Sequence, residues 1–161
     1  MFERVTIVGV GLIGGSLAAA LKRFALVGEI AGVSSPATTE KALELGIIDR
    51  AYGYDQLDQG VRGAGLVVLC TPIARILELV PAVSRVVAPG TIVTDAGSTK
   101  RRIMQCAASH VPDNVVFIGG HPMAGSEKSG VSASDPFLFE NTIFVLAPSP
   151  APTSKTLKQL R

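Results

Sequence analysis

Several side chains that mark whole classes of protein are scarce in this sequence. Among its 161 residues there is no tryptophan, and there are only two histidines and two cysteines, Cys70 and Cys106. Cysteines so few and so far apart exclude a disulfide framework and lack the spacing of a zinc site. We therefore expect buried thiols in a reducing compartment and no metal.

Long apolar segments and charge runs are absent as well. No apolar run reaches 18 residues, and residues 1–4 run straight into a predicted strand without a basic leader segment. Fifteen basic and thirteen acidic side chains leave a net charge of +2, and no cluster of Lys or Arg could follow a phosphate backbone. These absences predict a cytoplasmic protein that has neither a membrane nor a nucleic acid as its partner.

The residues that are present suit an α/β fold. Hydrophobic residues make up 47% of the chain and charged residues 17%, which fits one domain with a packed core. Short β-branched runs predict strands at 5–8, 29–33, around Tyr52, and at 66–70, 91–95, 115–119 and 142–147. Helical spacing of apolar residues predicts helices at 14–24, 35–45, 73–87 and 99–109, with Pro81 expected to kink or split the third and 55–65 expected to be a surface loop.

The alternation of strands and helices predicts the fold class. It implies right-handed βαβ crossovers, and hence an α/β protein with a doubly wound, mainly parallel Rossmann-type sheet. Ligands of such sheets bind beyond the carboxyl ends of the strands. We expect this domain to span residues 1–147, and residues 148–161 to be a proline-rich linker and the start of a truncated helix.

A glycine-rich turn lies between the first predicted strand and the first predicted helix. Gly9, Gly11 and Gly14 enclose Leu12 and Ile13 in a Gly-x-Gly-x-x-Gly pattern. Gly9 permits the tight turn, Gly11 lets the backbone approach a pyrophosphate, and Gly14 allows the helix to pack closely on the strand. Because free amides at a helix N-terminus favour a phosphate, these five residues are candidate ligands of NAD or NADP. A glycine turn that serves only a flavodoxin-like or methyltransferase-like sheet is the alternative.

Other residues at this edge bear on which dinucleotide is bound. NAD sites usually carry an acid at the end of the second strand, where it binds both ribose hydroxyls. Here Ser34 occupies that position and Ser35 follows. An acid would repel a 2′-phosphate, whereas two small hydroxyls beside a helix start can accommodate one, so the pattern favours NADP slightly over NAD. Cys70, Thr71 and Pro72, after the fourth strand, are expected to line the same cofactor site.

Two later loops carry the candidate catalytic side chains. Ser98 follows the fifth strand and is expected to cap the next helix, to contact the substrate, or to do both, whereas Lys100 is expected to be a surface cation. His121, flanked by glycines and a proline after the sixth strand, is well placed for proton transfer. His110 lies near a helix C-terminus, where a cation offsets the helix dipole, and has no expected chemical role.

Four motifs together resemble a known family. Gly-x-Gly-Leu-Ile-Gly-Gly-Ser, Cys-Thr-Pro, Asp-x-Gly-Ser-x-Lys and His-Pro-Met-Ala-Gly-Ser-Glu occur in the order and spacing of the prephenate and arogenate dehydrogenases. The resemblance covers residues 5–147 and departs from the commonest pattern at Ser34, where many members carry an acid. It implies an all-helical domain, missing from this chain, that dimerises and completes the active site. The full-length form is therefore expected to be a homodimer, and this chain an inactive fragment.

The same resemblance implies a reaction, the oxidative decarboxylation of prephenate or arogenate with NAD or NADP. His121 would accept the proton of the substrate hydroxyl, and Ser98 would hydrogen-bond this hydroxyl or hold the imidazole in the required tautomer. Ser126 and Glu127 are further substrate-side candidates, with a hydrogen-bond network inside the loop as the alternative. No step of this reaction calls for a metal.

Three other functions share parts of the pattern. A dehydrogenase of the hydroxyacid or 6-phosphogluconate type would share the fold and the glycine turn, but would place a lysine base in a helical domain. A non-catalytic dinucleotide-binding module would not need the loop that carries His121. A methyltransferase would use the same kind of sheet for S-adenosylmethionine, and titration with each cofactor would distinguish it.

Overall fold

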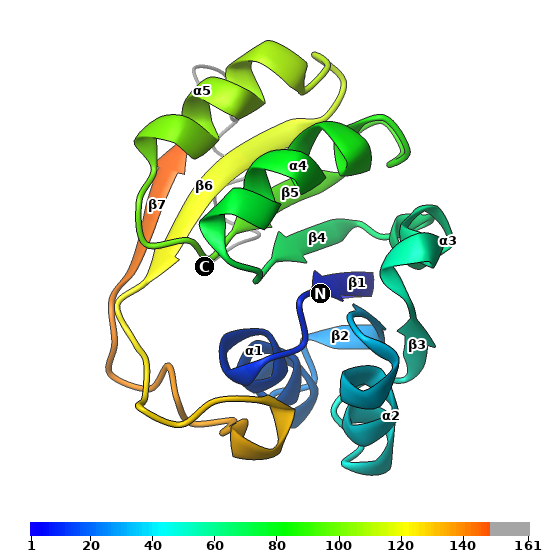
Figure 1. Ribbon diagram of the computed structural model, residues 1–161, viewed down its shortest axis with the longest axis vertical. Coiled ribbons are helices and arrows are strands. Elements are labelled where there is room, and N and C mark those ends of the chain that lie inside the picture. The colour runs from blue at the N-terminus through cyan, green and yellow to red at the C-terminus, as the bar shows by residue number, and fades with distance from the viewer. Residues whose placement is uncertain (149–161) are drawn as a thin grey trace.

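The computed structural model describes residues 1–148, so the linker and helix start expected at 148–161 lie outside the described residues except for Pro148. One sheet of seven strands has the order β3-β2-β1-β4-β5-β6-β7 (Figure 1). The strands are β1 (Phe2–Val8), β2 (Val27–Val33), β3 (Arg50–Tyr52), β4 (Leu66–Leu69), β5 (Ile92–Asp95), β6 (Val116–Pro122) and β7 (Phe144–Pro148). The helices are α1 (Leu12–Arg23), α2 (Pro36–Glu44), α3 (Leu57–Val61), α4 (Ile73–Ser84) and α5 (Arg101–His110), with 3-10 turns η1 (Tyr54–Gln56) and η2 (Val131–Ala133). Among the described residues, no helix is both long and apolar enough to cross a membrane.

The direction in which the sheet grows reverses at β1. This strand pairs in parallel with β2 on one side and with β4 on the other. The first six strands are all parallel, and β7 is antiparallel to β6. The topology confirms the predicted doubly wound, mainly parallel sheet. In such a sheet the ligand crevice lies beyond the carboxyl ends of the strands at the reversal, which are β1 and β4 here.

Buried side chains form two apolar layers, one on each face of the sheet. Along β4, Leu66 and Val68 join one layer, whereas Val67 and Leu69 join the other, as the alternation of side chains in a strand requires. Helices α1 and α2 cover the first layer, and α4 and α5 cover the second (Figure 1). The central strands are therefore buried on both faces, which explains their continuous apolar sequences.

Helix α4 is one continuous helix, so the split expected at Pro81 does not occur. Pro81 has no N–H to donate to the carbonyl of Leu77, four residues before it. The thiol of Cys106 on α5 donates to this carbonyl instead, with an S–O distance of 3.4 Å. A neighbouring helix thus supplies the hydrogen bond that proline removes from α4.

The expectation of a surface loop at 55–65 is wrong, because η1 and α3 form there. Gly60 in α3 is buried, and a Cβ at this position would lie 2.5 Å from a methyl carbon of Val33. The hydroxyl of Thr6 on β1 donates to the Gly60 carbonyl at 2.8 Å. The glycine lets this segment approach the sheet closely, and long-range contacts then order it as a helix.

Residues 123–143 connect β6 to β7 and pass beside α1. They are here called the crossing segment. Figure 1 shows this segment in yellow and orange leaving the end of β6, passing beside α1 and returning to β7. The backbone N–H of Asp135 donates to the hydroxyl of Ser16 on α1 at 2.9 Å. The guanidinium of Arg23, at the end of α1, lies 4.3 Å from the ring centre of Phe137. The crossing segment is thus fastened along the helix that follows the glycine turn.

Candidate functional site

The glycine turn has the geometry that its sequence predicts. Gly9 has a φ of +95°, and a Cβ there would lie 2.6 Å from the carbonyl oxygen of Cys70. A Cβ at Gly14 would collide with the Gly9 carbonyl and lie 2.8 Å from a methyl carbon of Ile7. A Cβ at Gly11, in contrast, would meet no atom within 4 Å. Gly9 and Gly14 are therefore needed for packing, whereas Gly11 borders open space into which a bound group fits.

Helix α1 presents free amides to this open space. The helix begins at Leu12, two residues before the predicted start, with Gly11 as its N-cap. The first helical hydrogen bond runs from the N–H of Gly15 to the carbonyl of Gly11, at 2.8 Å. The N–H groups of Leu12, Ile13 and Gly14 therefore have no partner within the helix. No acidic side chain lies in the first turn, so nothing there competes with an anion.

Cys70, Thr71 and Pro72 border the other side of the glycine turn. The N–H of Cys70 donates to the carbonyl of Val8 at 2.7 Å, which holds the end of β4 against β1. Thr71 packs against Gly9, and its hydroxyl oxygen is buried without a hydrogen-bond partner among the described residues. Burial, and secondarily the negative charge of Asp95, raise the pKa of the Cys70 thiol to about 12. An unpaired buried hydroxyl beside an open anion site fits the polar groups of a dinucleotide.

Ser34 and Ser35 lie at the end of β2, as the sequence predicts. The N–H of Ser34 donates to the carbonyl of Tyr52 at 3.1 Å, and Ser34 is buried. Ser35 is the exposed N-cap of α2, with Pro36 at the first helical position, and its hydroxyl lies 2.8 Å from that of Thr38. No carboxylate occupies either position, so the feature that usually binds the ribose of NAD is absent here.

The loop between β5 and α5 is organised by Asp95, a residue to which the sequence-based prediction gave no role. Its side chain is fully buried. One carboxylate oxygen accepts from the N–H of Gly97 at 2.8 Å and from the ammonium of Lys100, and the other accepts from the N–H of Gly120 at 3.2 Å. The expectation that Lys100 is a surface cation is therefore wrong. The sequence did contain a signal for this ion pair, because Asp95 ends an apolar strand and Lys100 follows it five residues later.

Of the two roles expected for Ser98, the first, capping α5, is wrong. The helix begins at Arg101, and its N-cap is Lys100, without a side-chain hydrogen bond. Ser98 lies in the exposed part of the loop, directly after Gly97, whose N–H is bound by Asp95. The hydroxyl therefore sits at the carboxyl edge of β5, where its alternative role of contacting a substrate stays a prediction.

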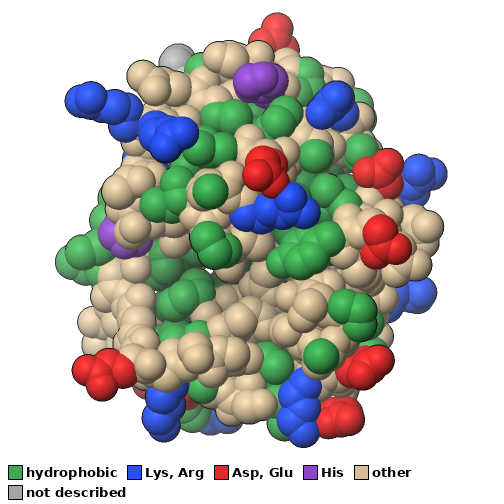
Figure 2. Space-filling view, viewed as in Figure 1, with side chains coloured by type: hydrophobic (Ala, Val, Ile, Leu, Met, Phe, Trp, Pro, Cys, Tyr) green, Lys and Arg blue, Asp and Glu red, His purple; other side chains and the backbone are tan. Residues whose placement is uncertain are grey.

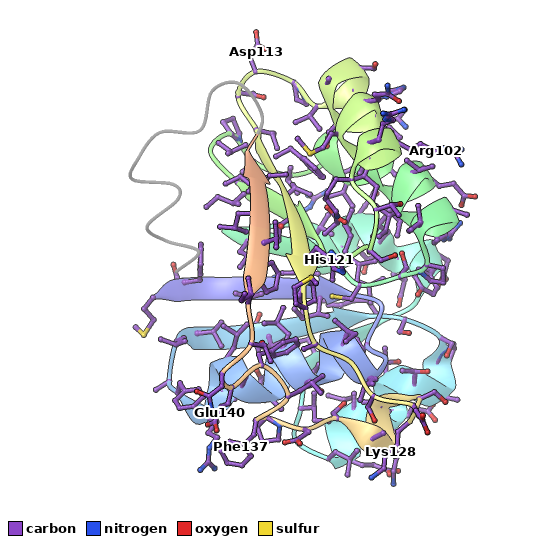
Figure 3. All side chains as sticks on the ribbon, turned by 90° about the vertical axis from the view of Figure 1, so that its left-hand side faces the viewer. Arg102, Asp113, His121, Lys128, Phe137 and Glu140 are labelled. Atoms are coloured by element: carbon purple, nitrogen blue, oxygen red, sulfur yellow. The ribbon has the colours of Figure 1, made fainter. Side chains whose placement is uncertain are left out.

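His121 lies inside β6, whereas the sequence predicts a position after the strand. Strand β6 continues to Pro122 because β7 pairs with it, and His121 stands opposite Val145. Since side chains alternate along a strand, His121 shares a face with Gly119, where a Cβ would lie 3.1 Å from the Lys100 side chain. The half-buried His121 thus lies on the side of the sheet that faces α5, at the carboxyl end of β6 (Figure 3).

Ser126 and Glu127 lie on the exposed first part of the crossing segment. The hydroxyl of Ser126 accepts from the N–H of Lys128 at 3.2 Å, which is the local hydrogen bond expected as an alternative to substrate contact. Figure 3 shows Lys128 well apart from His121, toward the end of the molecule that contains α1 and α2. Within residues 1–148, no three His, Cys, Asp or Glu side chains are grouped so that they could hold a metal ion.

These residues meet around one edge of the sheet. The glycine turn, Thr71 and Ser34 surround the carboxyl ends of β1, β4 and β2, and Ser98 and His121 follow at β5 and β6. In Figure 2 the surface is hollowed where the half of the molecule with α4 and α5 meets the half with α1. The arrangement can hold an anionic dinucleotide at α1, which follows β1, and present an imidazole on β6, three strands away.

Comparison with known proteins shows the family to which the chain belongs. The family model described as "Prephenate dehydrogenase, nucleotide-binding domain" matches residues 17–161. A prephenate dehydrogenase of Bacillus subtilis is 37% identical over 163 residues, which cover 100% of this chain but 43% of the relative. This chain thus spans less than half the length of that relative.

Solved structures give the same result. The prephenate dehydrogenase of A. aeolicus, in complex with hydroxyphenyl propionate and NAD+, has a TM-score of 0.89 and 33% identity, over 99% of this chain and 55% of that chain. The arogenate dehydrogenase of Synechocystis has a TM-score of 0.88 and 35% identity, over 98% of this chain and 54% of that chain. Because the family model also covers most of its length, this chain belongs to the prephenate dehydrogenase family and carries the N-terminal nucleotide-binding domain of that family.

Proposed function

We propose that the chain is the cofactor-binding half of a dehydrogenase that oxidises and decarboxylates prephenate or arogenate. The observation that carries the proposal is the open space at Gly11, bordered by the free amides of Leu12 and Ile13. The family supports the choice of substrate, since relatives with this domain are a prephenate dehydrogenase, an arogenate dehydrogenase and a cyclohexadienyl dehydrogenase. These names state the activities of the relatives, and we infer the same kind of activity for the protein that contains this chain.

Each residue of the edge has a role in the proposed reaction. The amides of the glycine turn bind the pyrophosphate, and the bound nicotinamide supplies a hydride acceptor for the ring carbon that bears the hydroxyl. His121 takes the hydroxyl proton as the carbonyl forms. The ring carboxylate then leaves as carbon dioxide, its bonding electrons make the ring aromatic, and His121 returns the proton to the resulting phenolate. Ser98 hydrogen-bonds the reacting oxygen or holds the imidazole, and Ser126 and Glu127 contact the substrate.

The cofactor is NADP or NAD, and Ser34 favours NADP. A carboxylate at the end of β2 would repel a 2′-phosphate, whereas the hydroxyls of Ser34 and Ser35 leave room for it beside the N-terminus of α2. The A. aeolicus relative was solved with NAD+, which is why NAD stays the alternative to NADP in this proposal. The remaining residues of the cofactor site, Cys70, Thr71 and Pro72, would line the side of the bound dinucleotide opposite α1.

The rest of the enzyme is proposed to lie in an all-helical domain beyond this chain. That domain would bind the substrate carboxylates, exclude water and form a homodimer. The enzyme would act in the cytoplasm on its small-molecule substrate, without a nucleic acid or a membrane as partner. Under this proposal the 161-residue chain binds the cofactor but does not turn the substrate over.

Titration of a Gly11→Val variant tests the cofactor site. A valine side chain would fill the open space that the pyrophosphate needs, so binding of NAD and NADP should be lost while the fold is retained. Isothermal titration measures the affinity, and circular dichroism checks the fold. Gly125→Val is the matched control, because a Cβ at Gly125 also meets no atom within 4 Å but lies in the crossing segment. Unchanged affinity in Gly11→Val would remove the glycine turn from the site.

A further inference from the structure

A buried carboxylate joins the loop that carries Ser98 to the end of strand β6, which carries His121. Asp95 has none of its surface exposed, although it is ionisable. Its two oxygens accept hydrogen bonds from the N–H of Gly97 and the N–H of Gly120, at 2.8 and 3.2 Å. Gly97 directly precedes Ser98, and Gly120 directly precedes His121. One side chain therefore binds the backbone next to each of these two residues.

Lys100 stabilises this carboxylate in its buried place. A carboxylate taken out of water is strongly destabilising unless it is paired and hydrogen-bonded. The ammonium of Lys100 contacts the Asp95 oxygen that also accepts from Gly97, and one fifth of the Lys100 side chain is exposed. Since Lys100 is the N-cap residue of α5, the ion pair also fixes the start of that helix against β5.

Both glycines leave little room for a side chain, and Gly120 leaves none. A Cβ at Gly97 would lie 3.0 Å from the Asp95 carboxylate and 2.9 Å from Ile103. A Cβ at Gly120 would collide with the Asp95 backbone carbonyl and lie 2.8 Å from the ring of Phe144. The β5–α5 loop at Gly97 and strand β6 at Gly120 therefore both pass close to Asp95. Neither amide needs a charged acceptor for the fold alone, because a neutral side chain or a water would also satisfy it.

We propose that Asp95 is a positioning residue, which together with Lys100 fixes the backbone beside His121 and Ser98 and thereby aims the imidazole at the reacting hydroxyl. The inference rests on the proposed function, in which His121 is the proton acceptor. A charged acceptor makes stronger hydrogen bonds than a neutral one, so it restricts the β5–α5 loop and the end of β6 more tightly. Such restriction has a direct effect on rate, since a misplacement of about 1 Å can cost about 100-fold.

Nuclear magnetic resonance of the 161-residue chain tests this with Asp95→Asn. Asparagine has the same shape but one acceptor oxygen, so it cannot accept from Gly97, Gly120 and Lys100 together. We expect the His121 ring resonances to shift and broaden, and the Gly120 amide to exchange with solvent at least about tenfold faster. The matched control is Asp49→Asn, because Asp49 also accepts from a backbone N–H, that of Ile30 at 2.8 Å, and from a lysine, Lys22 at 2.6 Å. This control should leave the His121 signals unchanged.

Variants of Lys100 keep the proposal testable if Asp95→Asn does not fold. Lys100→Met leaves the carboxylate unpaired and should shift the same His121 signals, and Lys100→Arg, which restores the cation, should return them toward wild type. Unchanged His121 resonances in both Asp95→Asn and Lys100→Met would overturn the proposal, as would an equal shift in Asp49→Asn. Titration of the wild-type chain with NAD and NADP separates the positioning role of Asp95 from the proposed function. If the wild-type chain binds neither cofactor, the proposed function is refuted, but the positioning role of Asp95 is not.

Discussion

The Thr71 hydroxyl oxygen and the Asp95 carboxylate are buried polar groups at the carboxyl edge whose surroundings differ sharply. Asp95 accepts from three donors, whereas the Thr71 hydroxyl has no partner among the described residues. A buried polar group without a hydrogen bond costs about 1–3 kcal/mol of stability. The methyl group of Thr71 packs against Gly9 of the glycine turn, so a cofactor bound at this turn is the partner that we expect to offset this cost.

Ser34, the residue that follows β2, should control the choice of dinucleotide. Ser34→Asp should shift preference toward NAD, because a carboxylate binds the ribose hydroxyls and repels a 2′-phosphate. The ratio of the two dissociation constants, measured by isothermal titration, checks this. Ser109→Asp, an exposed position near the end of α5, is the matched control. A wild-type chain that already prefers NAD strongly would contradict our assignment of NADP.

The thiol of Cys70 should make the stability of the fold depend on alkaline pH. Its pKa is raised to about 12 in the fold, above the value of about 8.5 expected in the unfolded chain. Between these values the folded state holds the proton and the unfolded state does not, so the free energy of unfolding falls as pH rises. The free energy of unfolding begins to fall near the pKa of the thiol in the unfolded chain and continues to fall toward its pKa in the fold.

Urea denaturation gives the free energy of unfolding of wild type and of Cys70→Ala at each pH from about 8 to 10.5. The difference between the two proteins at each pH isolates the contribution of Cys70. Cys106, whose pKa burial also raises, is present in both proteins and drops out of the difference. The difference should narrow as pH rises, because only the wild type loses the contribution of a protonated buried thiol. A difference that is constant with pH would contradict the raised pKa.

At the scale of elements, α4 depends on α5 for its continuity. Cys106→Ala should lower the free energy of unfolding by about 1 kcal/mol, because the Leu77 carbonyl loses its donor next to Pro81. In a Pro81→Ala background the same change should cost less, since the alanine supplies a backbone N–H that can donate to the Leu77 carbonyl. A double-mutant cycle from urea denaturation measures this coupling.

Cys106→Ser is the control for that cycle, because a hydroxyl can also donate to the carbonyl. It should be less destabilising than Cys106→Ala in the wild-type background. Strictly additive effects of the changes at positions 81 and 106 would show that the thiol does not compensate for the proline.

Elements with local signals could be predicted from the sequence, and elements that depend on distant contacts could not. The glycine turn and the start of α2 at Ser35 follow from residues within a few positions of each other. Helix α3 was missed because Gly60 is ordered by Val33 and Thr6, far away in the chain. The extension of β6 through His121 was missed because its cause is β7, more than 20 residues later.

The candidate site also contains residues whose positions could be predicted from local signals and residues whose roles could not. The residues of the glycine turn and the position of Ser34 were predicted, since strand ends and turns fix them. The ion pair of Asp95 and Lys100 was not, although the two residues are close in sequence. Whether a lysine is a surface cation or the partner of a buried carboxylate depends on how deeply the strand before it is buried, and helix periodicity does not reveal that.

At the scale of the whole molecule, we expect the 161-residue chain to bind NAD or NADP but to turn over prephenate and arogenate negligibly. The cofactor residues all lie in the described domain. The edge around His121, however, leaves Met123, Ile143 and Val145 exposed, by 57%, 69% and 45%, so water is not excluded there. Without a wall that holds the substrate, the proximity contribution of roughly 7–11 kcal/mol would be largely lost. Isothermal titration and an absorbance assay for reduced nicotinamide test the two parts separately.

Addition of the proposed helical domain, as one longer polypeptide, should restore turnover. In that protein His121→Asn should lower kcat by about 10²-fold to 10⁴-fold with little change in KM, as expected for loss of a positioned base. Rapid turnover by the 161-residue chain alone would show that no further domain is needed. A His121→Asn enzyme as active as wild type would exclude His121 as the proton acceptor.

The crossing segment is closed at its base, where the N–H of Met123 donates to the carbonyl of Ile143 at 2.8 Å, directly beyond the pairing of β6 with β7. A loop closed in this way can change in length at little entropic cost, about 0.6 kcal/mol for each doubling. Insertions among its exposed residues 125–130, ahead of the buried Val131, would leave His121 in its place on β6. The proposed substrate contacts of this loop could therefore vary independently of His121, the proposed proton acceptor.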